Sequence, residues 1–134
     1  MDESDIELRN RIYREYVESG QSPAADELGL RRLHEAHALV LNPATAEVRM
    51  LNPFSLVPTA YRVNADGRWW YANCAWDALG ICAALHVDGR VETSCPDCGE
   101  PIALEIAAEQ PDDPSLLFHC LVPAARWWDD IVFT

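Results

Sequence analysis

The spacing of apolar residues changes period near residue 39, and this change constrains the fold more than any other feature of the sequence. Up to that point the apolar residues recur at helical spacing, which predicts a helix over residues 5–17. Ser22-Pro23 has the pattern of an N-cap followed by proline and predicts a short helix over residues 22–28. A third helix is predicted over residues 30–37, after an interruption at Gly29.

The next segment has the pattern of a β-hairpin. Two apolar runs, residues 39–41 and 48–51, flank the turn-forming sequence Asn42-Pro43-Ala44-Thr45. Three short helices followed by a β-ribbon are typical of a winged helix. Residues 1–52 are therefore predicted to form a winged-helix-like helical lobe.

From Tyr61 onward the sequence mixes strand and helix signals. An apolar segment, residues 75–85, predicts a helix buried nearly all round, and Asp66-Gly67 is a turn signal. Strands are predicted over residues 61–63, 90–93, 102–106 and 116–122. The chain is therefore predicted to be an α+β protein.

Charge and hydropathy exclude several classes of function. With 22 acidic against 10 basic residues, the formal net charge is −12, which disfavours tight binding to nucleic acid. No apolar run is long enough for a membrane span, and the acidic N-terminus lacks signal-peptide features, so a cytoplasmic location without a membrane partner is expected. A winged-helix regulator remains an alternative, because residues 29–37 include Arg31, Arg32 and two histidines.

A reactive centre is suggested by Cys74 and Asp77, which share one face if the segment opens a helix. A helix N-terminus favours the thiolate form of cysteine. The neighbouring rings of Trp69, Trp70 and Trp76 would exclude water and raise the pKa of Asp77 toward that of a proton donor. The alternative is a core helix that carries one cysteine and one capping aspartate.

Several segments, taken in order, resemble the organomercurial lyase (alkylmercury lyase) family. The sequence Cys-Ala-Trp-Asp-Ala-Leu at residues 74–79 is similar to the family's first catalytic segment, and residues 52–59 are similar to its Pro-Phe-Ser…Pro-Thr stretch. Residues 94–104 resemble the segment that carries a third, mainly structural cysteine, and residues 126–131 also have counterparts in some members. The resemblance implies that residues 53–134 form a small mixed α/β lobe of the lyase type, on which the N-terminal lobe packs.

The resemblance also implies a chemistry. Cys74 would be the first mercury ligand and Asp77 the proton shuttle, with Trp69, Trp70 and Trp76 as part of an apolar wall. Thiolate is a soft ligand that matches mercury. No cofactor is required, because mercury enters with the organomercurial substrate and leaves as an ion.

The family's second active-site cysteine is expected to fall just beyond Thr134. Cys120 comes too early in the chain to align with it, and it could replace that ligand only if its predicted strand faces the same pocket. A non-catalytic protein that binds soft metals through Cys74 and the pair Cys95 and Cys98 is therefore a second hypothesis. Oligomerisation is left open.

Cys95 and Cys98 form a Cys-x-x-Cys knuckle followed by glycine, which is typical of half a zinc site. His119 and Cys120 are the candidates for the other two ligands, but adjacent residues on a strand point to opposite faces. The family match favours instead a packed thiol pair that forms a disulfide on oxidation. An odd total of five cysteines excludes a complete disulfide framework.

Overall fold

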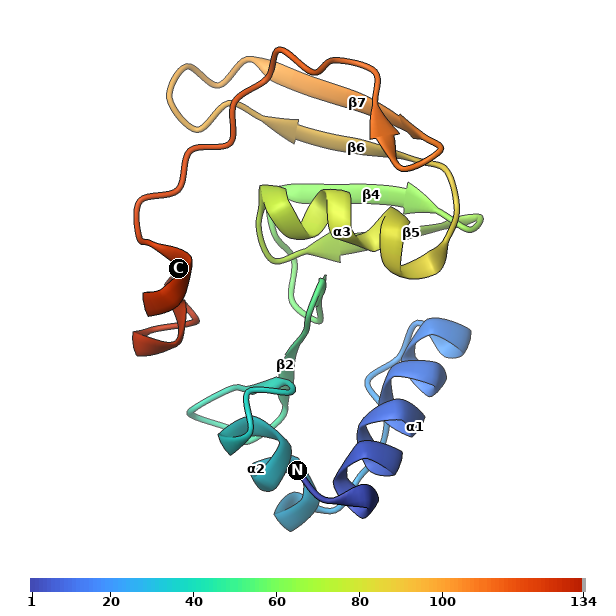
Figure 1. The fold of residues 1–134 in the computed structure, drawn as a ribbon, viewed down its shortest axis with the longest axis vertical. Helices are drawn as coiled ribbons and strands as arrows, with labels where there is room; N and C mark the ends of the chain where they lie inside the picture. Colours follow the sequence, from blue (N-terminus) through green and yellow to red (C-terminus); the bar gives the residue numbers. More distant parts are fainter. Residues whose placement is uncertain (134) are drawn as a thin grey trace. The chain divides into compact units, whose positions relative to one another are not determined.

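The computed structural model describes residues 1–133. Their contacts define two compact units, a helical unit (Met1–Leu51 with Cys120–Thr134) and a sheet unit (Asn52–His119). Figure 1 shows the first in blue to cyan and red, and the second in green to orange. The predicted lobes, residues 1–52 and 53–134, stay a prediction.

The helical unit begins with a long helix whose ends the sequence specifies. The Asp2 side chain accepts a hydrogen bond from the Asp5 N–H at the start of this helix, and Gly20 ends it with φ at +69°. The helix and the hairpin predicted for this part of the chain are confirmed. The elements of this unit are α1 (Glu3–Ser19), α2 (Glu27–Glu35), β1 (Val40–Leu41), β2 (Val48–Leu51), antiparallel to β1, and the 3₁₀ helix η1 (Ala124–Asp129).

The predicted short helix at residues 22–28 is wrong, and the third predicted helix is part of α2. Asp26 is the N-cap of α2, because its carboxylate accepts a 2.7 Å hydrogen bond from the Gly29 N–H. Gly29 does not interrupt the helix. A Cβ at this position would lie 2.6 Å from the Leu8 side chain, so the glycine permits the close approach of α1 and α2. Residues 1–39, which precede the hairpin, therefore form two helices. The winged-helix prediction was based on three.

The sheet unit is one antiparallel sheet with a single helix, α3 (Ala75–Leu85), which contacts β4, β5 and β6. The strands predicted at residues 61–63, 90–93 and 102–106 are confirmed, as is the α+β class. In spatial order the strands are β3 (Phe54–Ser55), β5 (Arg68–Ala72), β4 (Tyr61–Ala65), β6 (Gly89–Ser94), β7 (Pro101–Ala107) and β8 (Gln110–Pro111).

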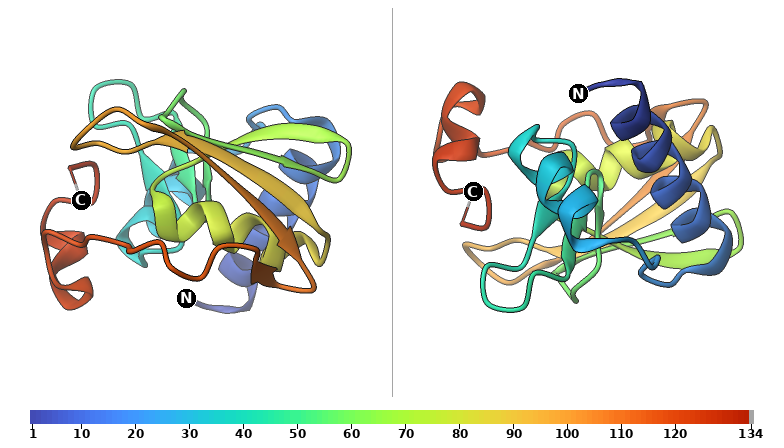
Figure 2. Two further views of the ribbon diagram at one scale, coloured as in Figure 1. Left: turned by 90° about the horizontal axis from the view of Figure 1, so that it is seen from above. Right: turned by 90° about the horizontal axis from the view of Figure 1, so that it is seen from below.

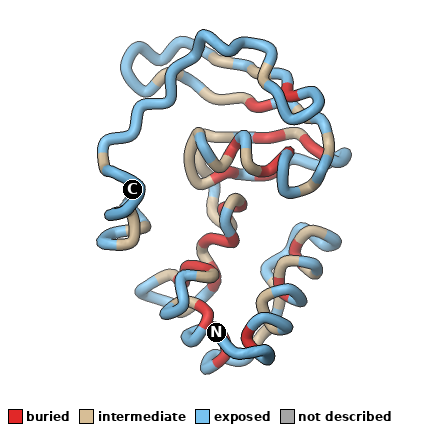
Figure 3. Tube along the Cα trace, in the orientation of Figure 1, coloured by how far each residue is buried: buried red, intermediate tan, exposed pale blue. Residues whose placement is uncertain are grey.

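The strand register gives the sheet two different faces. Val63 pairs with both Trp70 and Val91, and all three are buried on one face. Helix α3 covers this face with Ala78, Ile81 and Cys82, and Figure 2 shows the helix against the strands from two sides. The core of the unit therefore lies between α3 and this face, and the buried segments in Figure 3 follow the same elements.

Two predictions for the sheet unit and the segment after it are corrected. Helix α3 is not buried all round, because Trp76 is 62% exposed and Leu79 is also exposed. Residues 116–122 form no strand, and Leu117 is 95% exposed. Both edges of β7 are paired, one with β6 and the other with β8. Among residues 1–133, no helix combines the length and the apolar character that a membrane crossing requires.

Candidate active site

Cys74 lies at the junction between β5 and α3. It is the N-cap of α3 in an extended conformation, and its Sγ accepts a hydrogen bond from the Asp77 N–H over 3.5 Å. The thiol is half-buried and is not part of a disulfide. The positive end of the helix dipole and this N–H both favour an anionic sulfur. The sequence prediction that this cysteine opens a helix is thus confirmed.

Asp77 lies in the first turn of the same helix. It is half-buried, and burial raises the pKa of its carboxyl above the ordinary value, while a hydrogen bond with the Asn73 side chain opposes this rise. A carboxyl with a raised pKa keeps its proton to higher pH than an exposed one. The direction of this pKa shift agrees with the sequence prediction.

Asn73 is a site residue that the sequence analysis missed. Its Nδ2 lies within hydrogen-bond distance of Asn52 Oδ1 at 2.9 Å, the Phe54 carbonyl at 3.1 Å and the Pro53 carbonyl at 3.3 Å, and its two protons are shared among these acceptors and the Asp77 carboxyl. Its Oδ1 is buried without a hydrogen-bond partner. The signal in the sequence was a polar amide immediately before the cysteine. Asn73 thereby joins the Asp77 carboxyl to the segment that leads into β3.

The Pro-Phe-Ser…Pro-Thr segment contacts both elements that flank Cys74. Thr59 Oγ1 donates a 2.6 Å hydrogen bond to the carbonyl of Ala72, at the end of β5. A Cβ at Gly80 would lie 3.3 Å from Pro53, so α3 also passes close to this segment. The motif therefore fixes the two elements between which Cys74 lies.

The three tryptophans do not form one wall. Trp69 and Trp70 are neighbours on β5 and lie on opposite faces of the sheet. Trp70 is buried, donates its indole N–H to the Ala65 carbonyl at 3.0 Å and packs against Phe54. Trp69 is 45% exposed beneath the Arg62 guanidinium.

Trp76 remains as the exposed aromatic residue next to the candidate site. It is part of the first turn of α3, between Cys74 and Asp77 in sequence. Its ring centroid lies 6.4 Å from that of Phe118. Together with the exposed Leu79 one turn later, it gives this end of α3 an apolar surface.

The remaining thiols differ in environment. Cys82 is buried in the core as predicted, and burial, followed by the nearby Asp88 carboxylate, raises its pKa. Cys120 belongs to the helical unit and is exposed on an irregular segment, with its Sγ 2.7 Å from the Val122 carbonyl oxygen. The strand that was expected to orient Cys120 is not formed by residues 116–122. Its role as a second ligand stays a prediction.

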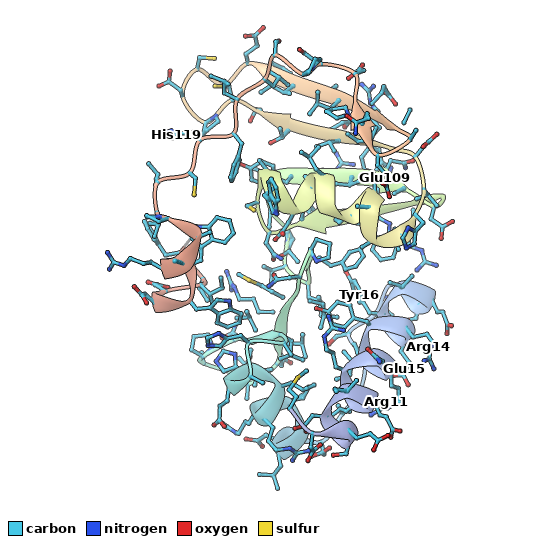
Figure 4. All side chains as sticks on the ribbon, in the orientation of Figure 1. Arg11, Arg14, Glu15, Tyr16, Glu109 and His119 are labelled. Atoms are coloured by element: carbon cyan, nitrogen blue, oxygen red, sulfur yellow. The ribbon has the colours of Figure 1, made fainter. Side chains whose placement is uncertain are left out.

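Residues 1–133 contain no complete zinc site. Cys95 is half-buried and Cys98 exposed on the β6–β7 turn, and both are free thiols. His119, labelled in Figure 4, lies on the same irregular segment as Cys120. Within residues 1–133, no three His, Cys, Asp or Glu side chains are grouped so that they could hold a metal ion.

Comparison with known proteins points to one family. The family model for alkylmercury lyase (MerB) matches residues 54–134. The alkylmercury lyases of Bacillus cereus and Clostridium butyricum are each 36% identical over 52 residues, which is 39% of this chain and 24% of theirs. The chain thus matches about a quarter of the length of these relatives.

A solved structure supports the fold. The crystal structure of the mercury-bound form of MerB2 superposes with a TM-score of 0.65 at 19% identity. The superposition covers 84% of this chain and 60% of that one. At this level of identity the likeness concerns the fold.

Proposed function

The chain belongs to the alkylmercury lyase family, and from that premise we propose that it cleaves a carbon–mercury bond at Cys74 and Asp77. One observation carries the proposal: α3 begins with a capping thiol and bears, in its first turn, a carboxyl whose pKa burial raises. A soft nucleophile and a proton donor on one helical turn are the two groups that this reaction needs.

In the first step, the Cys74 sulfur attacks the mercury of an organomercurial and displaces its inorganic ligand. A new sulfur–mercury bond forms, and the displaced ligand leaves with its electron pair. The thiol proton passes to the Asp77 carboxylate, which becomes the neutral acid. Sulfur donates electron density to the metal and makes the metal-bound carbon more basic.

In the second step, the Asp77 acid gives its proton to that carbon. The carbon–mercury bond breaks, its electron pair forms the new carbon–hydrogen bond, and the hydrocarbon leaves. The mercuric ion remains on Cys74, and Asp77 is a carboxylate again. Burial of Asp77 supports this step, because a raised pKa keeps the acid form available nearer neutral pH.

The surroundings suit a small apolar organic group. Trp76 and Leu79 expose apolar surface on the same helix. Asn73 forms a hydrogen bond with the Asp77 carboxyl, and its Nδ2 also faces the carbonyls of Pro53 and Phe54 at the start of β3. We assign Asn73 a positioning role and Trp76 a substrate-binding role.

The direct test is benzene release from phenylmercuric acetate in the presence of an excess of a small thiol. Wild type should release benzene, and Cys74→Ser and Asp77→Asn should release it far more slowly. Asp66→Asn is a matched control for the second variant, because Asp66 is an exposed carboxylate in the β4–β5 turn of the same unit. Equal release from wild type and Cys74→Ser would contradict the proposal.

A second candidate function is retention of soft metal without cleavage. It is favoured by the free thiols of Cys95 and Cys98, which belong to the same unit as Cys74. Stoichiometric mercury binding without benzene release would identify this function. No observation of this kind favours the winged-helix regulator, because the described residues before the hairpin form two helices, α1 and α2.

A further inference from the structure

The β6–β7 turn brings two free thiols to the end of the sheet that also carries Cys74. Ala72, the last residue of β5, pairs with Tyr61, and Arg62 pairs with Glu92 near the end of β6. The loop after β5 and the turn after β6 therefore leave the sheet at the same end. Cys74 lies on that loop, and Cys95 and Cys98 lie on that turn.

The backbone of the turn folds tightly around the pair. The Cys95 N–H donates to the Glu100 carbonyl and the Gly99 N–H to the Cys95 carbonyl, both at 2.8 Å. Gly99 has φ at +74°, a left-handed conformation that glycine adopts without strain. This geometry brings the Cys98 side chain close to the Cys95 sulfur.

The same turn places backbone N–H groups near the Cys95 sulfur. The N–H of Cys98 and that of Asp97 both face it. Cys98 itself is exposed, so a solute can reach the pair. Asp97 and Glu100 add exposed carboxylates beside the sulfurs, and the chain carries a net charge of −12, which attracts cations.

We propose that Cys95 and Cys98 form a two-sulfur chelate for a thiophilic cation of low coordination number, the mercuric ion in this protein. Two thiolates complete the coordination of such an ion, whereas zinc requires four ligands, and no third ligand is grouped with the pair within residues 1–133. On binding, two sulfur–mercury bonds form and each thiol gives its proton to solvent. The choice of mercury as the ion rests on the proposed lyase function.

The chelate would receive the ion that cleavage leaves on Cys74. A thiolate of the pair attacks the mercury, the second sulfur of the pair binds in turn, and the Cys74 sulfur leaves and takes up a proton. No oxidant or reductant is needed, because mercury stays divalent throughout. The exchange frees Cys74 for the next substrate.

The test separates this site from the reaction centre by using a Cys74→Ser background. The purified full chain is titrated with mercuric chloride against an excess of glutathione, and X-ray absorption counts the sulfur ligands. We expect one ion per chain with two sulfur ligands. Adding Cys98→Ser or Cys95→Ser should weaken binding by about 100-fold or more, because the two sulfurs no longer act together.

Cys120→Ser in the same background is the matched control, since it removes one exposed thiol of the helical unit and should leave this affinity unchanged. Circular dichroism checks that each variant is folded. Unchanged affinity in Cys98→Ser, or four sulfur ligands from a pair of chains, would overturn the proposal. Because Cys74 is absent throughout, failure of the lyase proposal would appear only in the benzene assay.

Discussion

Replacing Asn73 by alanine should destabilise the chain although the residue belongs to no helix or strand. Its side-chain nitrogen faces four acceptors, on Asn52, Pro53, Phe54 and the Asp77 carboxyl, but carries only two protons. Two hydrogen bonds are therefore lost, which at about 0.5–1.5 kcal/mol each amounts to about 1–3 kcal/mol of unfolding free energy. Removal of the buried, unpartnered Oδ1 offsets part of this loss.

The measurement is urea unfolding followed by tryptophan fluorescence, with an unchanged slope so that the midpoint reports stability. Asn10→Ala is the control, because Asn10 is an exposed residue of α1, where the same substitution should change stability by less than about 0.5 kcal/mol. Equal midpoints for Asn73→Ala and wild type would refute the structural role assigned to this amide.

Three further predictions concern α3 and the strands beneath it. Asp77→Asn should lower benzene release by about 10²–10⁴-fold. The same variant should raise the unfolding free energy at neutral pH. The pKa of Asp77 in the folded chain lies above the value of 3.8 for the unfolded chain, so the wild-type chain loses stability as the pH rises from 3.8 to the folded pKa. The amide has no such loss, and urea midpoints measured across this pH range would detect the difference. Ile81→Ala, at a fully buried position, should cost about 2–5 kcal/mol in urea unfolding. Gly89→Ala should cost about 1–3 kcal/mol by the same assay, because its Cβ would lie 2.6 Å from the Asn64 carbonyl oxygen and 2.7 Å from Cys82 Sγ. Wild-type midpoints for the last two variants, or a wild-type pH profile for the first, would contradict these estimates.

The sequence predicted those elements whose signals are local. The hairpin of β1 and β2, the strand β4 and the helix α3 each begin or end at a turn or cap that neighbouring residues specify. Where the sequence misled, a distant residue decided the outcome. Gly29 has the pattern of a helix breaker, but its lack of a side chain serves the packing of Leu8 from α1.

The candidate site was predictable in its chemistry and not in its surroundings. The spacing of Cys74 and Asp77 indicated a shared helical turn, and the family resemblance indicated which residues to examine. The partners of Asn73 come from a segment about twenty positions earlier in sequence, so no local pattern reveals them. Similarly, Trp69 and Trp70 look equivalent in sequence, and only the strand pairing shows that the sheet separates them.

In the proposed reaction, mercury would compete with the first turn of α3 for the lone pairs of the Cys74 sulfur. While the Cys74 sulfur accepts the Asp77 N–H, it helps to hold the first turn in place. Once the sulfur is metallated that acceptor is weakened, and helix caps are worth about 0.5–2 kcal/mol. On this proposal, mercury bound to Cys74 would loosen the first turn of α3, which carries Asp77, and release of the ion would restore that turn. On this proposal, mercury occupancy of Cys74 and the order of the first turn of α3 are thermodynamically coupled.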